Sequence, residues 1–187
     1  MPSIVEIDEI NGAGVRTHGV GNLNVGNIDA PNIVVTPTTA IRKDANGKAQ
    51  SYIKYNQLHF VSIPEGVTVS NIRVWATVAT ASAATETAVT NLNTDQTTYN
   101  LHKKLHASGI EIPTANRLVW SSTIPTEEPV TGGQPTPNLG IGGVLNGTLT
   151  GSGYSDYFIW QVQISPTAPP SKIHQRQLMF AWDEDET

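Results

Sequence analysis

Hydrophobic and polar residues alternate over several stretches of this 187-residue chain, with the period of two that is typical of β-strands. Four apolar side chains share one face of the stretch 154–165: Phe158, Trp160, Val162 and Ile164. After a proline-containing turn, three more share one face of the stretch 174–182: Leu178, Phe180 and Trp182. Because proline cannot donate a ladder hydrogen bond, the turn separates two strands. We predict that these strands form an antiparallel pair.

A second predicted pair lies on either side of a turn at residues 64–66. Leu58 and Phe60 precede this turn. Four alternating apolar residues follow it: Ile72, Val74, Ala76 and Val78. Near the start of the chain, Val5 and Ile7 alternate with Glu6 and Asp8 before a turn signal at 11–12, which indicates another strand.

One stretch, 93–109, is ambiguous between helix and strand. Leu101 and Leu105 stand four residues apart and Gly109 follows them, which predicts a short helix. The β-branched and aromatic run at 97–99 favours a strand instead.

Two segments, 11–32 and 124–153, are rich in glycine, asparagine or proline and carry only scattered apolar residues. Many short strands with turn signals between them favour an all-β fold. We predict a single domain over 1–187, an antiparallel β-sandwich of the immunoglobulin-like or jelly-roll type. A loop-like arm at about 11–50 and a long Gly/Pro-rich loop at about 124–153 are expected to project from it. Four apolar residues of the arm are predicted to contact a partner protein: Val20, Leu23, Val25 and Ile28.

The net charge of −5 is concentrated at one end of the chain. Residues 183–186 supply −4 of it, which leaves −1 for the rest. A near-neutral body lacks the basic surface that nucleic-acid binding requires. The chain contains no cysteine and no run of about 18 apolar residues, so a disulfide framework is excluded and a membrane span is not expected. The acidic run itself is expected to be a solvated tail.

Candidate catalytic and metal-binding patterns are weak. His102 and His106 have the spacing of two ligands on one helical face, but the glutamate of H-E-x-x-H is missing and two lysines lie between them. His18, His59 and His174 stand alone in the sequence. The glycine-rich stretches lack the lysine and serine or threonine of a phosphate-binding loop. We therefore predict no catalytic residue, no metal site and no cofactor.

The four tryptophans, at positions 75, 120, 160 and 182, allow two interpretations. Large rings on alternating strands are most often buried in the core. Alternatively, Trp75 or Trp120 together with glycine-rich loops could form a stacking platform for a sugar.

Several short stretches, in this order, carry a resemblance to a known family: "EINGAG", "GVGNLNVGNIDAPN", "SYIKYNQLHF", "NIRVWA", "NLGIGG", "GYSDYFIWQVQIS" and a final "FAWDE". With these the chain resembles small structural proteins encoded by tailed bacteriophages. The resemblance implies a non-enzymatic virion component that is made in the host cytoplasm and binds other virion proteins and copies of itself. We expect an auxiliary capsid protein, of the decoration or cement kind. The alternatives are a tail, neck or baseplate component, or a carbohydrate-binding module for host attachment.

Overall fold

A computed structural model describes residues 1–24, 26, 28–37, 39–41, 49–52, 54–78, 88–96, 122–123, 127–164 and 176–186. At 49–50, 77–78, 88–96, 122–123, 160–164 and 176, only the backbone is described. The regular elements of these residues are all strands, and each pairing between them is antiparallel. No helix in this part of the chain is long and apolar enough to cross a membrane. The all-β prediction is therefore confirmed for the described residues, and the helix predicted near Leu101 lies outside them.

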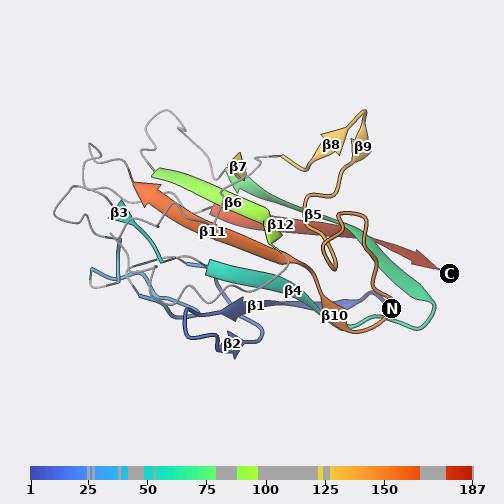
Figure 1. The fold of residues 1–187 in the computed structure, drawn as a ribbon, viewed down its shortest axis with the longest axis horizontal. Coiled ribbons are helices and arrows are strands. Elements are labelled where there is room, and N and C mark those ends of the chain that lie inside the picture. Colours follow the sequence, from blue (N-terminus) through green and yellow to red (C-terminus); the bar gives the residue numbers. More distant parts are fainter. Residues whose placement is uncertain are drawn as a thin grey trace.

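The strands are β1 (Ile4–Ile10), β2 (Arg16–Thr17), β3 (Ala49–Gln50), β4 (Lys54–Ser62), β5 (Val67–Val78), β6 (Ala88–Gln96), β7 (Ser122–Thr123), β8 (Val130–Thr131), β9 (Gln134–Pro135), β10 (Gly153–Tyr154), β11 (Tyr157–Ile164) and β12 (Arg176–Glu186). The larger sheet has the order β2-β1-β4-β11-β6-β7, with β10 also paired to β4 and β3 to β11. β5 and β12 form a separate two-stranded ribbon, and β8 and β9 form a small hairpin (Figure 1).

Both predicted strand pairs are wrong in their partners, although the strands themselves are present. β11 pairs with β4 and β6, whereas β12 pairs with β5. The turn after β4 likewise leads into the ribbon and not back along the larger sheet. Alternation of apolar residues fixes which face of a strand is buried, but it does not fix which strand lies beside it.

The core lies between the larger sheet and the ribbon. Leu58, Phe60 and Phe158 of the larger sheet belong to the same buried cluster as the apolar residues of β5, which are Val69, Ile72, Val74 and Ala76. Two aromatic pairs join the layers: Phe60 with Trp182 at 5.4 Å between ring centroids, and Phe158 with Phe180 at 5.2 Å. Tilted and edge-to-face pairs of this kind each contribute about 0.5–1.5 kcal/mol beyond their burial.

The N-terminal segment, residues 11–37, lies against its own domain where it is described. The backbone N–H of Val20 donates to the carbonyl of Ile7 on β1 at 2.8 Å, and the side chain of Ile33 is buried. The Lys54 ammonium donates to the carbonyl of Ala30. The sequence predicted that this segment would project as an arm. Its backbone and its buried apolar side chains instead find partners on the sheet, so its described residues do not form a free arm.

The glycine-rich segment, residues 127–153, also differs from the projecting loop that was predicted. Leu139 is fully buried, and the Asn138 side-chain amide bonds both the N–H and the carbonyl of Val74. Gly143 donates its N–H to Asp156, next to the start of β11. The β8–β9 hairpin does extend away from the two layers (Figure 1).

The acidic run, residues 183–186, forms the end of strand β12 and is not a free tail. Residues 183–186 continue the pairing of β12 with β5. Asp183 accepts hydrogen bonds from Arg73 and Asn71 at 2.8 and 2.6 Å. Glu128 accepts another from Arg73 at 2.8 Å. Arg73 on β5 thus offsets the charge of Asp183. The side chains of Glu184, Asp185 and Glu186 are exposed, as predicted, although their backbone is paired in the ribbon.

Candidate functional site

The strand pair β1–β4 presents two different faces, because its side chains alternate. On the inner face, Val5 and Ile7 of β1 pack against the core cluster. On the outer face, the register places Glu6 opposite His59. β2 pairs with β1 so that Thr17 lies opposite Glu9, and one more step brings His18 beside Asp8.

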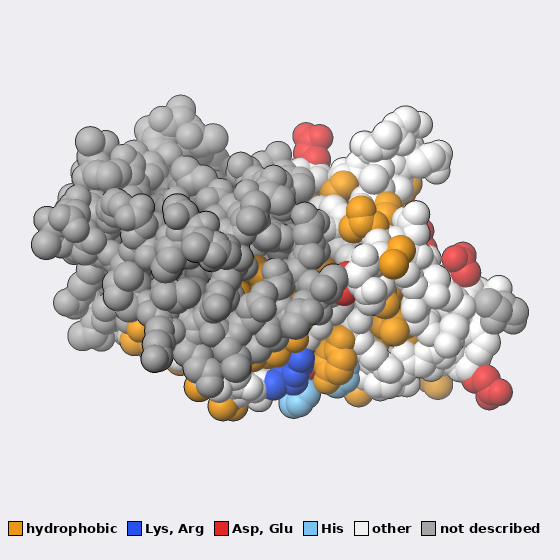
Figure 2. All heavy atoms as spheres, viewed as in Figure 1, with side chains coloured by type: hydrophobic (Ala, Val, Ile, Leu, Met, Phe, Trp, Pro, Cys, Tyr) orange, Lys and Arg blue, Asp and Glu red, His pale blue; other side chains and the backbone are white. Residues whose placement is uncertain are grey.

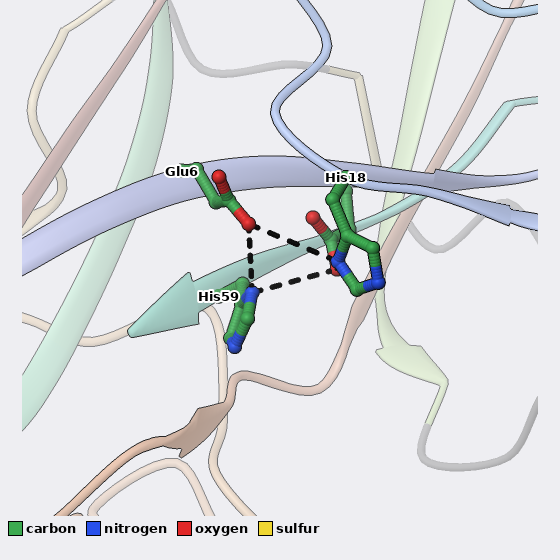
Figure 3. A group of neighbouring side chains, drawn as sticks. Glu6, His18 and His59 are labelled. Atoms are coloured by element: carbon green, nitrogen blue, oxygen red, sulfur yellow. Dashed lines mark hydrogen bonds and ion pairs between the residues drawn. The ribbon is translucent and has the colours of Figure 1, made fainter. Parts of the chain in front are cut away.

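Four side chains gather on this outer face in what we call the His-carboxylate cluster: Glu6, Asp8, His18 and His59. Figure 3 labels Glu6, His18 and His59 and shows their side chains turned toward one another. His59 Nδ1 lies 2.9 Å from Glu6 Oε1, and His18 Nδ1 lies 2.8 Å from Asp8 Oδ2. The two crossed distances are longer: 3.8 Å between His18 Nδ1 and Glu6 Oε1, and 3.7 Å between His59 Nδ1 and Asp8 Oδ2. One nitrogen or oxygen from each residue therefore faces a common centre, and all four atoms lie within 4.8 Å of one another.

Burial decreases across the cluster from the sheet to solvent. The Asp8 side chain has no exposed surface, whereas that of His18 is 55% exposed. Histidine and basic side chains lie together at one edge of the described surface in Figure 2. The cluster is thus rooted in the sheet and open to solvent on the His18 side.

Neighbouring groups hold the cluster in place. The N–H of Gly19 donates to Asp8 Oδ1 at 3.3 Å, and Arg16 donates to Asp8 Oδ2 at 3.2 Å. The His59 ring stacks on Tyr154, with 4.4 Å between centroids and 16° between planes. The Arg16 guanidinium in turn lies 4.5 Å from the centre of the same Tyr154 ring. These contacts limit the rotation of the aspartate and of one imidazole.

Imidazole nitrogens and carboxylate oxygens are the donors that first-row divalent metals take from proteins that offer no cysteine. The same groups can instead share protons as hydrogen-bonded ion pairs. Both uses place a positive charge, from metal or from protonated imidazole, beside the buried Asp8.

The inner face of the same strand pair holds a different charged group. Lys54 Nζ donates to Glu9 Oε1 at 2.6 Å, and both side chains are 1% exposed. Burial raises the pKa of Glu9, and the charge and hydrogen bond of Lys54 oppose that rise only in part. Burial also raises the pKa of nearby Asp29, whose carboxylate accepts a hydrogen bond from the Gly12 N–H at 2.7 Å. This group fastens the N-terminal segment to the sheet.

The residues predicted to contact a partner are spread over different environments. Val20 is buried, and Leu23 packs partly buried against the core cluster, so both contact their own domain. Ile28 is exposed, and Val25 lies outside the described residues. The three that are described do not form one exposed surface, and contact of the four residues with a partner stays a prediction.

The metal-ligand pattern considered in the sequence, His102 with His106, lies outside the described residues, as does Trp120. Trp75 is half-buried on β5. His18 and His59, which stand alone in the sequence, are brought together by the fold. The signal that could have found them is the alternation of Glu6 and Asp8 on one face, but it becomes useful only once the β1–β4 and β1–β2 registers are known.

Comparison of the chain with protein-family models, with curated proteins and with solved structures finds no match.

Proposed function

We propose that this chain is a non-enzymatic structural component of a tailed-bacteriophage virion that acts through protein–protein contacts. Within the particle, we favour a place on the outside of the head, where the protein would act as a decoration or cement protein. The two packed layers are proposed to belong to a β-sandwich of the immunoglobulin-like or jelly-roll type. The observation that carries the proposal is the placement of the exposed apolar side chains.

Ten large apolar side chains are exposed among the described residues, and seven of them lie in the two irregular segments, residues 11–37 and 127–153. These seven are 39% to 72% exposed: Val15, Ile28, Val34, Val35, Val130, Val144 and Leu145. Orange apolar side chains are visible across the described part of the surface in Figure 2. Apolar side chains that face water on loops are available to become buried against another protein.

The backbone beneath these side chains is held by specific hydrogen bonds. Asn32 Oδ1 accepts from the N–H groups of Gly21 and Asn22, at 2.7 and 3.1 Å. The Thr39 hydroxyl donates to the carbonyl of Val34 at 2.7 Å. Loops held in this way lose little conformational entropy on binding, which favours their use as contact surfaces.

Repetition in a particle would strengthen such contacts. Each copy buries only a few valine and leucine side chains, which gives a modest contact free energy. Copies bound side by side on a symmetric surface add their contacts through avidity. The partners are therefore the major capsid protein and neighbouring copies of the chain itself.

The test is reconstitution of phage heads that lack this protein with purified wild-type chain or with the double variant Val34→Ser, Val35→Ser. Wild-type protein should reach a saturating copy number on heads, and the double variant should bind at least ten-fold more weakly. Val61→Ser is the matched control, because Val61 is also exposed but lies on β4, outside both irregular segments. It should bind like the wild type. Binding to tails but not to heads would move the protein to the tail alternative, and binding to neither would contradict the proposal.

A further inference from the structure

We propose that the His-carboxylate cluster binds one divalent transition-metal ion, of which zinc is the best match. The ligands are Nδ1 of His18, Nδ1 of His59, Oε1 of Glu6 and Oδ2 of Asp8. The ion joins three stretches that are separate in sequence: β1, the residue that follows β2, and β4.

The four nitrogen-to-oxygen distances in the cluster lie close to those of a tetrahedral shell. Zinc bonds to imidazole and carboxylate of about 2.0–2.1 Å require neighbouring ligand atoms to stand roughly 3.3–3.4 Å apart. The four nitrogen-to-oxygen distances in the cluster are 2.8, 2.9, 3.7 and 3.8 Å, two slightly shorter and two slightly longer than that value. Shifts of about half an ångström or less would make them equal. The exposed His18 side chain can adjust its own two distances, whereas the two distances of His59 require movement of Glu6 and of His59 itself.

The donor types select the class of ion. Two imidazole nitrogens with two carboxylate oxygens suit zinc, cobalt or nickel, whereas calcium and magnesium take oxygen ligands almost alone. Four protein ligands complete a tetrahedron and leave no position for a reacting water, which is the arrangement of structural sites. The role of the ion is therefore to hold segments together.

Among the described residues, Arg16 is the basic group that contacts the cluster, and its charge opposes a cation there. Its guanidinium already has other partners, the Gln57 side-chain oxygen at 2.7 Å and the face of Tyr154. With neutral imidazoles, the two carboxylates and Arg16 sum to −1, so a divalent ion brings the group to +1. A carboxylate oxygen can accept a hydrogen bond while it binds a metal, and such bonds orient metal ligands. Arg16 thus lowers the affinity of the site but also fixes Asp8 for binding.

The site supplies a link that this chain cannot make with cysteine, of which it has none. His18 stands near the start of the N-terminal segment, and Gly19 and Val20 after it hydrogen-bond to Asp8 and Ile7. Binding of the ion would fix this end of the segment, as Lys54 fixes it farther along at Ala30.

The experiment is titration of zinc chloride into the full chain, purified without a polyhistidine tag and stripped with a chelator, followed by isothermal calorimetry. We expect saturation at one ion per chain. His18→Asn and Glu6→Gln should each weaken binding at least ten-fold. His174→Asn, which changes a histidine outside the four, should leave it unchanged. Cobalt in place of zinc should give the strong visible absorption of a tetrahedral ion, and this absorption should disappear in His18→Asn.

Three results would overturn the proposal: no saturable binding up to millimolar zinc, equal binding by wild type and His18→Asn, or loss of binding only in His174→Asn. Circular dichroism of each variant shows whether it is folded. Because His18 is largely exposed, His18→Asn should keep the wild-type spectrum, and Glu6→Gln is a second, independent change at the same centre.

Discussion

The two faces of the β1–β4 pair hold their carboxylates in opposite ways. On the inner face, Glu9 meets one fixed cation, Lys54, and the two are shielded from water. On the outer face, Glu6 and Asp8 meet two imidazoles and an arginine in a group that opens to solvent through His18. The same two strands therefore carry a closed ion pair and an open cluster, separated only by side-chain alternation.

The difference lies in what the partner group can do. Lys54 donates to Glu9 and to the Ala30 carbonyl, and both charged side chains are shielded from water, so the inner pair is closed to other ligands and serves packing. An imidazole can be neutral, protonated or bound to a metal, so the outer cluster can respond to its surroundings. Burial therefore fixes the chemistry of the inner face, whereas exposure leaves the chemistry of the outer face adjustable.

Removing one member of the buried Lys54–Glu9 pair should have the largest effect on the free energy of unfolding. Lys54→Ala leaves the buried Glu9 carboxyl group without its cationic partner, and removal of one member of such a pair costs about 3–5 kcal/mol. We expect a loss of that size in the free energy of unfolding, measured by urea denaturation.

The control for this change is the double variant Lys54→Met, Glu9→Met, which removes both charges and keeps most of the volume. A well-packed apolar replacement of a buried ion pair is often neutral or stabilising. It should recover at least half of the loss, although the Ala30 carbonyl still lacks its donor. A loss below about 1 kcal/mol in Lys54→Ala would show that water reaches the pair.

Zinc binding to the His-carboxylate cluster should have the next largest effect on the free energy of unfolding. A ligand that binds only the folded state at one hundred times its dissociation constant stabilises that state by about 2.7 kcal/mol. Zinc at that excess should raise the free energy of unfolding of the wild type by this amount. His18→Asn should gain much less at the same zinc concentration, and magnesium should have little effect on either protein. An equal gain in both proteins would place the stabilising ion elsewhere.

The strands themselves could be predicted from the sequence, because each apolar alternation is local. Val74 and Ala76 on β5, and Phe158 on β11, are buried as their spacing predicts. The partners of the strands could not be predicted, since β4 and β5 follow each other in sequence yet lie in different layers. A short turn is compatible with a hairpin and with a crossing between layers, and the choice depends on the packing of the whole core.

The candidate site was less accessible to sequence analysis than the fold. Glu6 and Asp8 are two residues apart, but His59 lies 53 residues beyond Glu6 and joins it only through strand pairing. His18 looked solitary because its companions come from β1 and β4. Non-local pairing, which no spacing rule describes, therefore creates the cluster.

A smaller effect is expected from the residue that supports the outer cluster. Gly19 has a φ of +60°, and a Cβ atom there would stand 3.1 Å from Glu6 Oε2. Gly19→Ala should cost about 1–3 kcal/mol because of the left-handed backbone, and it should also weaken zinc binding because it displaces Glu6. Gly132→Ala is the matched control, since φ there is +61° and nothing lies within 4 Å. It should lower stability in the same way but leave zinc binding unchanged. Equal zinc affinity in the two variants would contradict the role of Gly19.

The smallest effect on the free energy of unfolding is expected at the ion pair of Asp183 on β12 with Arg73 on β5. This pair is partly exposed and contains no histidine. Burial on its own would raise the pKa of Asp183, but hydrogen bonds from Asn71 and Arg73 and the charge of Arg73 outweigh it and hold that pKa below its ordinary value. Such a carboxyl group contributes stability that is full above its unfolded pKa, about 4, and is lost as the pH falls through the lower folded pKa. Because 41% of the side chain is exposed and solvent screens the pair, Asp183→Asn should cost less than about 1 kcal/mol at pH 7. Urea denaturation at pH 7 and pH 3 should show that this cost is smaller at pH 3. The control is Asp185→Asn, a change at an exposed residue, which should cost little at either pH. If the cost of Asp183→Asn is unchanged at pH 3, packing and not charge stabilises this end of β12.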